Sequence, residues 1–173
     1  MLKRVLFLLL LCSFTNTGLR AQSTNQESNL KAVFIYNFTK YIEWDNLNDE
    51  DNFIIGVMGN SSLDAAIEAI AKKNLVKNKK IILRHFNSLE EVGYCHILFI
   101  PRDYPVPVRA IAEKVSKKVL VISEKQGAAK QGASINFTLI NDKLKFEINP
   151  DAVYAARLKA SSQLLKLASN IQN

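Results

Sequence analysis

Cysteine and histidine are scarce in this sequence, which excludes several kinds of chemistry. The 173 residues include two cysteines, Cys12 and Cys95, and two histidines, His85 and His96. A structural zinc site needs about four such ligands at close spacing. These residues are too few and too scattered to provide them, so we expect no metal site and no cofactor.

The motifs of nucleotide binding and nucleophilic catalysis are also missing. Neither G-x-G-x-x-G nor G-x-x-x-x-G-K-[ST] occurs, so no phosphate-binding loop is indicated. The G-x-S-x-G elbow of α/β hydrolases is absent as well. We therefore assign no catalytic residue and expect that the protein is not an enzyme, with a hydrolase as the least favoured alternative.

Long apolar runs are absent, and a short one follows the charged start of the chain. Lys3 and Arg4 precede an apolar segment over residues 5–11, and Ala21 follows a polar stretch. That order is typical of a cleavable secretory signal, and the apolar segment is far shorter than the roughly 18 residues that span a bilayer. We predict a signal peptide over residues 1–21, export to the periplasm, and a flexible leader over residues 22–27.

The net charge is positive but small after export. Removing residues 1–21 takes away three of the 23 basic residues and none of the 16 acidic ones, which leaves 20 against 16, or +4. Nucleic-acid binding would need a concentrated basic stripe, whereas the lysines cluster only around one connecting loop, and we expect no nucleic-acid partner. The cluster consists of Lys72, Lys73, Lys77, Lys79 and Lys80.

Residues 28–173 read as one domain in which short apolar strands alternate with helices. Such alternation predicts a mostly parallel, Rossmann-like sheet flanked by helices, and hence an α/β fold. The segments Ser134–Ile140 and Lys143–Ile148, joined by Asn141 and Asp142, predict an antiparallel hairpin, and Pro150 opens a closing helix. The expected strands are 53–58, 81–83, 96–100 and 119–122, and the expected helices are 63–70, 105–115 and a short one opened by Ser88–Glu91.

The first helix is expected to begin at Ser28 or Asn29 and to end near Trp44. Its apolar side chains recur at spacings of three and four, which predicts one buried face. The residues assigned to that face are Leu30, Phe34, Phe38 and Tyr41.

Four residues of this helix fall off the apolar stripe or at its end. They are Lys31, Asn37, Lys40 and Trp44. A partly exposed tryptophan beside a basic edge has the composition of a binding hot spot, so these residues are the candidate partner-binding surface. The alternative, that Trp44 fills the edge of the sheet, stays open at this point.

Cys95 is the only cysteine left after signal cleavage, so no internal disulfide can form. It begins an apolar segment that reads as an interior strand. We therefore expect a buried free thiol.

Several segments together resemble the YfiR-like family of periplasmic regulators. The similarity covers residues 28–170, and five segments carry it in the same order along the chain. They are residues 30–44, 95–100, 135–137, 145–149 and 158–167.

The resemblance implies an α/β regulator that binds the periplasmic part of an inner-membrane signalling protein, typically a diguanylate cyclase, and represses it. The resemblance also allows other partners, namely a histidine kinase or an outer-membrane or cell-wall associated protein. It leaves open whether the protein forms a homodimer. Redox sensing through disulfides, known in the namesake branch, is not expected with Cys95 alone. A periplasmic module that binds a small ligand or a cell-wall fragment at the carboxyl ends of the strands is the alternative function.

Overall fold

The computed structural model describes residues 17–45, 47, 51–115 and 117–172. Most of the predicted signal peptide, including Cys12, lies outside the described residues. Helix α2 (Thr17–Tyr41) includes residues 22–27, which the sequence predicts as a flexible leader. The start of the mature chain stays a prediction. Among the described helices, none is long and apolar enough to cross a membrane.

The main sheet has eight strands, and its centre is parallel. The neighbours β4–β2–β5–β6–β7 all run in the same direction, β8 pairs antiparallel with β7, and β10 pairs parallel with β8. In spatial order the strands are β10 (Asn170–Ile171), β8 (Lys143–Ile148), β7 (Ile135–Ile140), β6 (Leu120–Ser123), β5 (Ile97–Ile100), β2 (Asn52–Met58), β4 (Lys79–Phe86) and β3 (Leu75–Val76). The predicted α/β class and parallel centre are confirmed.

The hairpin between β7 and β8 is also confirmed. Asn141 and Asp142 both have positive φ, 51° and 58°, as a two-residue turn between antiparallel strands of natural twist requires. The pairing places Ile140 opposite Lys143 directly beside the turn. Asn and Asp tolerate this backbone region better than other non-glycine residues do.

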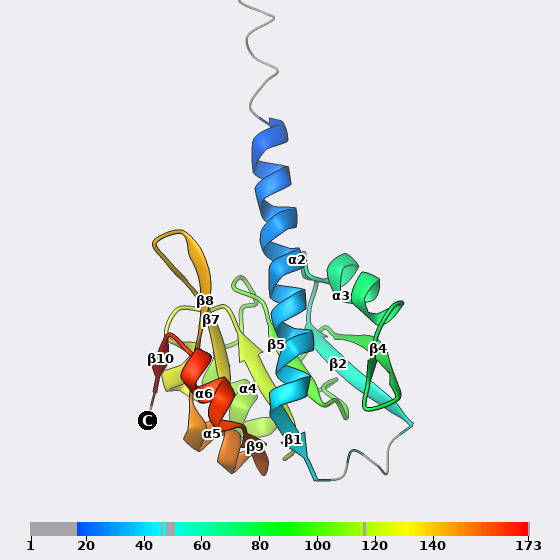
Figure 1. Ribbon diagram of the computed structural model, residues 1–173, viewed down its shortest axis with the longest axis vertical. Helices are drawn as coiled ribbons and strands as arrows, with labels where there is room; N and C mark the ends of the chain where they lie inside the picture. The colour runs from blue at the N-terminus through cyan, green and yellow to red at the C-terminus, as the bar shows by residue number, and fades with distance from the viewer. Residues whose placement is uncertain (1–16, 46, 48–50, 116, 173) are drawn as a thin grey trace, which may run out of the picture.

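Helices cover both faces of the sheet, and α2 runs across one of them and projects beyond the strands (Figure 1). The shorter helices are α3 (Asp64–Ala71), α4 (Val108–Lys114), the 3-10 helix η2 (Ala128–Gln131), α5 (Pro150–Ala155) and α6 (Ser162–Leu167). Pro150 stands in the first turn of α5 as predicted, and the Asn149 side chain caps that helix by accepting from the Ala152 N–H at 2.9 Å.

Alternating residues of the strands fill two separate hydrophobic cores. On β2, Phe53 and Ile55 join the core beneath α2 and α3, whereas Ile54 and Met58 join the core beneath α4. This alternation follows from the two-residue period of a strand. Because both faces are covered, the central strands read as unbroken apolar runs in the sequence.

The buried face of α2 is rotated from the face that the sequence predicts. Leu30 is 45% exposed, and Phe34 and Tyr41 are only partly buried, whereas Ala32 and Ile35 are fully buried. Apolar residues surround nearly the whole helix here, so spacing alone does not select one face.

The end of the first helix was also predicted wrongly, because α2 stops at Tyr41. The next three residues form strand β1 (Ile42–Trp44), which pairs antiparallel with β9 (Leu158–Ala160) in a small second sheet. Glu43 stands opposite Lys159, a pairing of opposite charges that favours this register.

Two further expectations need correction. Residues 88–91 form bends and a turn, with no helix, although the Asn87 N–H does donate to Glu91 Oε2 at 2.9 Å. The closing helical region, for which the sequence allows a bend near residues 158–161, is divided into α5, β9, α6 and β10, since Arg157 adopts a positive φ of 57° and redirects the chain into β9.

Cys95 is a buried free thiol, as predicted. Burial raises the pKa of its thiol to about 12, so almost no reactive thiolate forms at neutral pH. Labelling of Cys95 in the native protein, followed by peptide mass spectrometry, should therefore proceed at the rate of unfolding and rise sharply in denaturant. Rapid labelling of the native protein would contradict this assignment.

Candidate functional site

The carboxyl ends of the parallel strands gather the polar loops of the molecule. The strand order places β2 beside β5, while the chain leaves β2 toward β4 on one side and later crosses to β5 on the other. Ligands of open α/β sheets bind at such a switch point, outside the carboxyl ends of the strands. The loops there are residues 59–63 after β2, 101–107 after β5 and 124–127 after β6.

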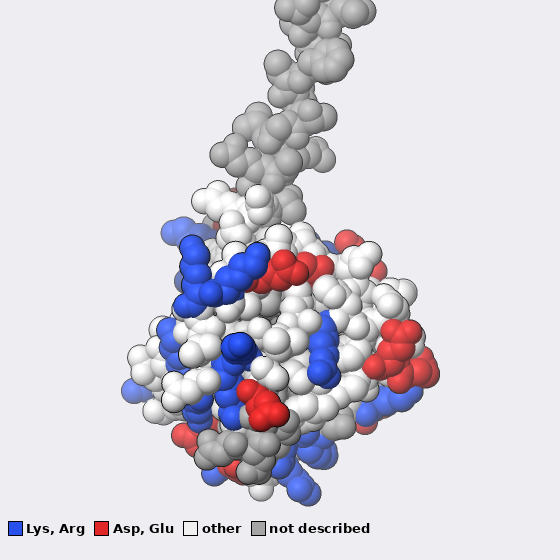
Figure 2. Space-filling model, turned by 90° about the vertical axis from the view of Figure 1, so that its right-hand side faces the viewer, with Lys and Arg blue, Asp and Glu red and all other residues white. Residues whose placement is uncertain are grey.

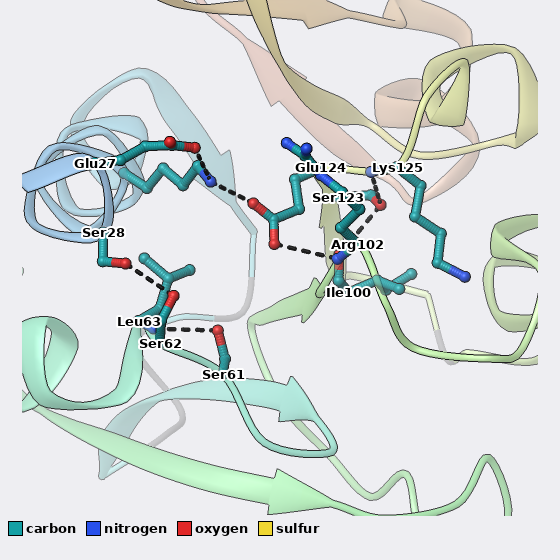
Figure 3. A network of polar contacts seen from close by, with 11 residues as sticks. Glu27, Ser28, Ser61, Ser62, Leu63, Ile100, Arg102, Ser123, Glu124 and Lys125 are labelled. Atoms are coloured by element: carbon teal, nitrogen blue, oxygen red, sulfur yellow. Dashed lines mark hydrogen bonds and ion pairs between the residues drawn. The ribbon is translucent and has the colours of Figure 1, made fainter. Parts of the chain in front are cut away.

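A buried ionic network fastens α2 to this edge (Figure 3). The Lys31 ammonium contacts Glu27 at 2.5 Å and also contacts Glu124, which follows β6. The other oxygen of Glu124 accepts from the Arg102 N–H at 3.1 Å. Lys31 is buried and both its partners come from within the chain. Lys31 therefore holds the helix on the sheet. Its charge is not exposed at the protein surface, although the sequence analysis placed Lys31 in the partner-binding surface.

Two hollows lie on either side of Glu124, which lines both. The smaller one, of about 340 Å³, is at the switch point between the loops after β2 and β5, with Asn60 and Tyr104 among its lining residues. The larger one, of about 820 Å³, extends from the loop after β6 across β7, β8 and β10. Its charged and amide lining includes Arg102, Lys130, Asn136 and Glu147.

Asn136 is an unusual residue in the larger hollow because it is polar and only 2% exposed. Its amide nitrogen donates to Glu147 Oε2 at 3.2 Å. Its amide oxygen is buried and has no hydrogen-bond partner in the part of the chain that the structure describes. Buried polar atoms in folded proteins are nearly always paired, so this oxygen is an acceptor available to a ligand or to water.

The residues predicted to bind a partner do not form one surface. Lys31 is buried in the ionic network, and Trp44 is 3% exposed. The expectation of a partly exposed tryptophan is therefore wrong. Asn37 and Lys40 do lie together, since the Lys40 ammonium donates to Asn37 Oδ1 at 2.9 Å on the outer side of α2.

Exposed apolar side chains continue that outer side of α2 toward its N-terminus. Leu30 and Val33 are 45% and 46% exposed. With Asn37 and Lys40 they follow the spacing of a single helical face. We call these four residues the outer stripe of α2. Sequence reasoning missed its apolar half because Leu30 was assigned to the core.

The lysine cluster surrounds the edge strand β3 and the end of α3, on the side of the molecule that Figure 2 faces. Lys and Arg side chains outnumber Asp and Glu in the left half of that view. Lysines beside an exposed strand edge prevent pairing with another chain. This provides a structural reason for the cluster without a nucleic-acid partner.

Both histidines make contacts within the fold. Within the described residues no group of three or more His, Cys, Asp or Glu side chains could hold a metal ion. His96 is buried, and its Nδ1 accepts from the Ile54 N–H at 2.9 Å, a structural role. His85 instead contacts Asp64 at 3.0 Å.

Sequence comparison assigns the family. The model of the YfiR/HmsC-like family matches residues 28–169, which is most of the chain. The chain belongs to the YfiR/HmsC-like family. Members of the YfiR/HmsC-like family are known as periplasmic regulators, so membership is consistent with a regulatory role. No curated protein matches the sequence.

Comparison with solved structures supports the fold of the YfiR/HmsC-like domain. One similar structure is described as a conserved domain protein from Vibrio cholerae O1 biovar El Tor strain N16961, with a TM-score of 0.55 and 11% identity. The alignment covers 84% of this chain and 60% of that chain, so this chain matches less than two thirds of its relative's length. At this identity the likeness concerns the fold alone.

Proposed function

We propose that this protein binds the periplasmic part of an inner-membrane signalling protein, of the diguanylate cyclase type, and represses it. Family membership supports a regulator, and the outer stripe of α2 supplies the contact surface. The observation that carries the proposal is the pair Leu30 and Val33, two aliphatic side chains exposed on a rigid helix that the Lys31 network anchors.

The outer stripe has the composition of a protein interface. Its apolar pair occupies one end, and the polar pair Asn37 and Lys40 the other, over eleven residues or about 15 Å of helix. Apolar surface removed from water supplies much of the free energy of a contact, whereas a charged rim residue mainly affects the association rate. We expect Leu30 and Val33 to determine the dissociation rate, and Lys40 the salt dependence.

The double substitution Leu30→Glu with Val33→Glu tests this surface. Burying a carboxylate against an apolar partner is costly, so capture of the purified periplasmic part of the cognate cyclase should weaken at least tenfold, about 1.4 kcal/mol. Both residues are exposed, so the melting temperature should stay nearly unchanged. Surface plasmon resonance and calorimetry provide the two measurements.

The matched control is Leu139→Glu, another exposed leucine, on the β7–β8 hairpin. It should leave capture unchanged. Repression is measured by cyclase turnover with and without the protein, and a cognate histidine kinase is tested alongside. If the double variant captures and represses as well as the parent chain, the outer stripe is not the contact surface.

A second candidate function is a module that binds a small ligand at the carboxyl edge. The unpartnered oxygen of Asn136 in the larger hollow favours it. Thermal shift against a panel of amino acids, nucleotides, saccharides and cell-wall fragments tests this function. Stabilisation should appear with at least one class, and a flat response to every class rejects it.

A further inference from the structure

The larger hollow contains a row of polar side chains that crosses three neighbouring strands. Asn136 on β7 stands in register with Glu147 on β8, which in turn stands in register with Asn170 on β10. All three line the hollow. Adjacent strands are about 4.8 Å apart, so the row extends over roughly 10 Å.

The inner part of this row offers hydrogen-bond acceptors. Asn136 lines the hollow, and its buried amide oxygen has no hydrogen-bond partner in the described part of the chain. Of the Glu147 carboxylate, Oε2 accepts from Asn136 and Oε1 has no hydrogen bond from a described side chain. A ligand that fits here must bring donors, and hydroxyl groups supply them without adding charge.

The lining of the hollow also includes cations, Arg102 and Lys130. Within the described part of the chain, the Arg102 guanidinium and the Lys130 ammonium have no hydrogen bond or ion pair. The loop after β5 supports Arg102, and η2 supports Lys130. Glu124, beside Arg102, is already occupied by Lys31 and by the Arg102 N–H. Two uncommitted cations favour a carboxylate, through charge-assisted hydrogen bonds.

We infer that this hollow binds a carboxylated saccharide. Its hydroxyl groups donate to Asn136 Oδ1 and to the Glu147 carboxylate, and its carboxylate accepts from Arg102 and Lys130. This inference rests on the second candidate function and names its ligand class. Cell-wall fragments that contain muramic acid and polysaccharides that contain uronic acids share this chemistry.

Other ligand classes fit the lining less well. A phosphorylated ligand would place more negative charge beside Glu147, and a cationic ligand would meet Arg102 and Lys130. A nucleobase would need an aromatic surface for stacking. Among the described residues that line the hollow, Phe137 is the one aromatic residue, and it is 3% exposed and packs into the core beneath α2.

The experiment is calorimetric titration with two carboxylated probes and their neutral counterparts. N-acetylmuramic acid is compared with N-acetylglucosamine, and glucuronic acid with glucose. At least one carboxylated probe should bind tenfold more tightly than its neutral counterpart. Tighter binding of N-acetylmuramic acid would indicate a cell-wall fragment as the ligand, and tighter binding of glucuronic acid would indicate a polysaccharide that contains uronic acids. Amide chemical shifts in NMR spectra should move at residues 136–138 and 147.

Variants locate the binding in the hollow. Arg102→Gln with Lys130→Gln should weaken the carboxylated probe at least tenfold and leave the neutral sugar unchanged. Lys143→Gln, an exposed lysine at the hairpin turn, is the matched control and should change neither. Asn136→Leu should weaken the binding of both the carboxylated probe and its neutral counterpart, because it removes the acceptor for hydroxyl groups. If that variant does not fold, the variant with substitutions at the exposed residues Arg102 and Lys130 still decides the test.

Three outcomes overturn the inference. They are equal binding of neutral and carboxylated probes, unchanged affinity in the Arg102 and Lys130 variant, and shifts confined to residues outside the hollow. If no saccharide binds at millimolar concentration while another class stabilises the protein, the ligand class is wrong and the second candidate function stands. If no compound of any class binds, both are rejected.

Discussion

Replacing Trp44 with alanine is expected to lower the free energy of unfolding by about 3–5 kcal/mol. Trp44 is buried, with its ring 5.3 Å from the ring of Phe53 in an edge-to-face contact. Its Nε1–H donates to the Lys118 carbonyl at 3.0 Å, just before β6. Alanine leaves a cavity and an unpaired carbonyl, so the melting temperature should fall by roughly 10 °C for a domain of this size.

Trp44→Phe is the matched control, because it keeps most of the apolar volume and removes the indole donor. It should cost about 1–2 kcal/mol, the usual penalty of one lost hydrogen bond and a smaller ring. Chemical denaturation followed by circular dichroism measures both variants. If Trp44→Ala left the melting temperature unchanged and reduced partner capture, Trp44 would belong to the binding surface after all.

Much of the fold could be predicted from the sequence because the parallel strands are buried on both faces. Residues 53–58, 97–100 and 120–122 are unbroken apolar runs. Such a strand can be predicted without deciding which of its faces is buried, because both are. The Asn141–Asp142 turn was equally readable, since it lies between two β-rich segments of matching length. These signals are local, and tertiary contacts reinforce them.

The rotation of α2 and the strand β1 could not be predicted because both depend on distant partners. Lys31 is buried only because Glu124, 93 residues away, reaches it. Residues 42–44 become a strand only because Leu158–Ala160 pairs with them. A helical continuation through Trp44 fits the local pattern equally well, and tertiary pairing overrides it.

The sequence indicates where in the fold a ligand would bind, but it does not indicate which residues line the larger hollow. The carboxyl ends of the strands follow from a parallel sheet, so the sequence indicates where a ligand would bind. Asn136 carried a readable signal, an amide within an apolar strand, yet its unpaired oxygen depends on the register with Glu147. Arg102 and Lys130 look like ordinary surface charges until the fold places them along one hollow.

The second large effect concerns His96, which should make the protein less stable as the pH falls from 6.5 to 4. Burial, with a smaller effect of the Lys79 charge, lowers the pKa of His96 to about 4. Its ring stacks on Phe53 at 4.5 Å between centroids, and Nδ1 accepts from the Ile54 N–H. Protonation of Nδ1 would therefore break a buried hydrogen bond and leave a charge in the core.

The sign follows from proton linkage. Above pH 6.5 both the folded and the unfolded chain hold a neutral His96, so this residue contributes no pH dependence. Between pH 6.5 and about 4 only the unfolded chain binds the proton, which lowers the free energy of unfolding as the pH falls. The two pKa values differ by about 2.5, which at about 1.4 kcal/mol for each unit corresponds to a full loss of about 3.5 kcal/mol. About 3 kcal/mol of this is lost by pH 4, where half of the folded chains bind the proton. Below pH 4 the folded chain binds the proton too, and the loss levels off.

His96→Gln isolates this contribution. The variant should be less stable than the parent at pH 7, because it loses the contacts with Phe53 and Tyr94. Its stability should fall less steeply from pH 6.5 to 4, so the difference between the two chains should shrink by up to about 3 kcal/mol. Carboxylates that titrate in this range are common to both chains and cancel in the comparison. Parallel curves for the parent and His96→Gln would show that His96 is not held neutral in the folded protein.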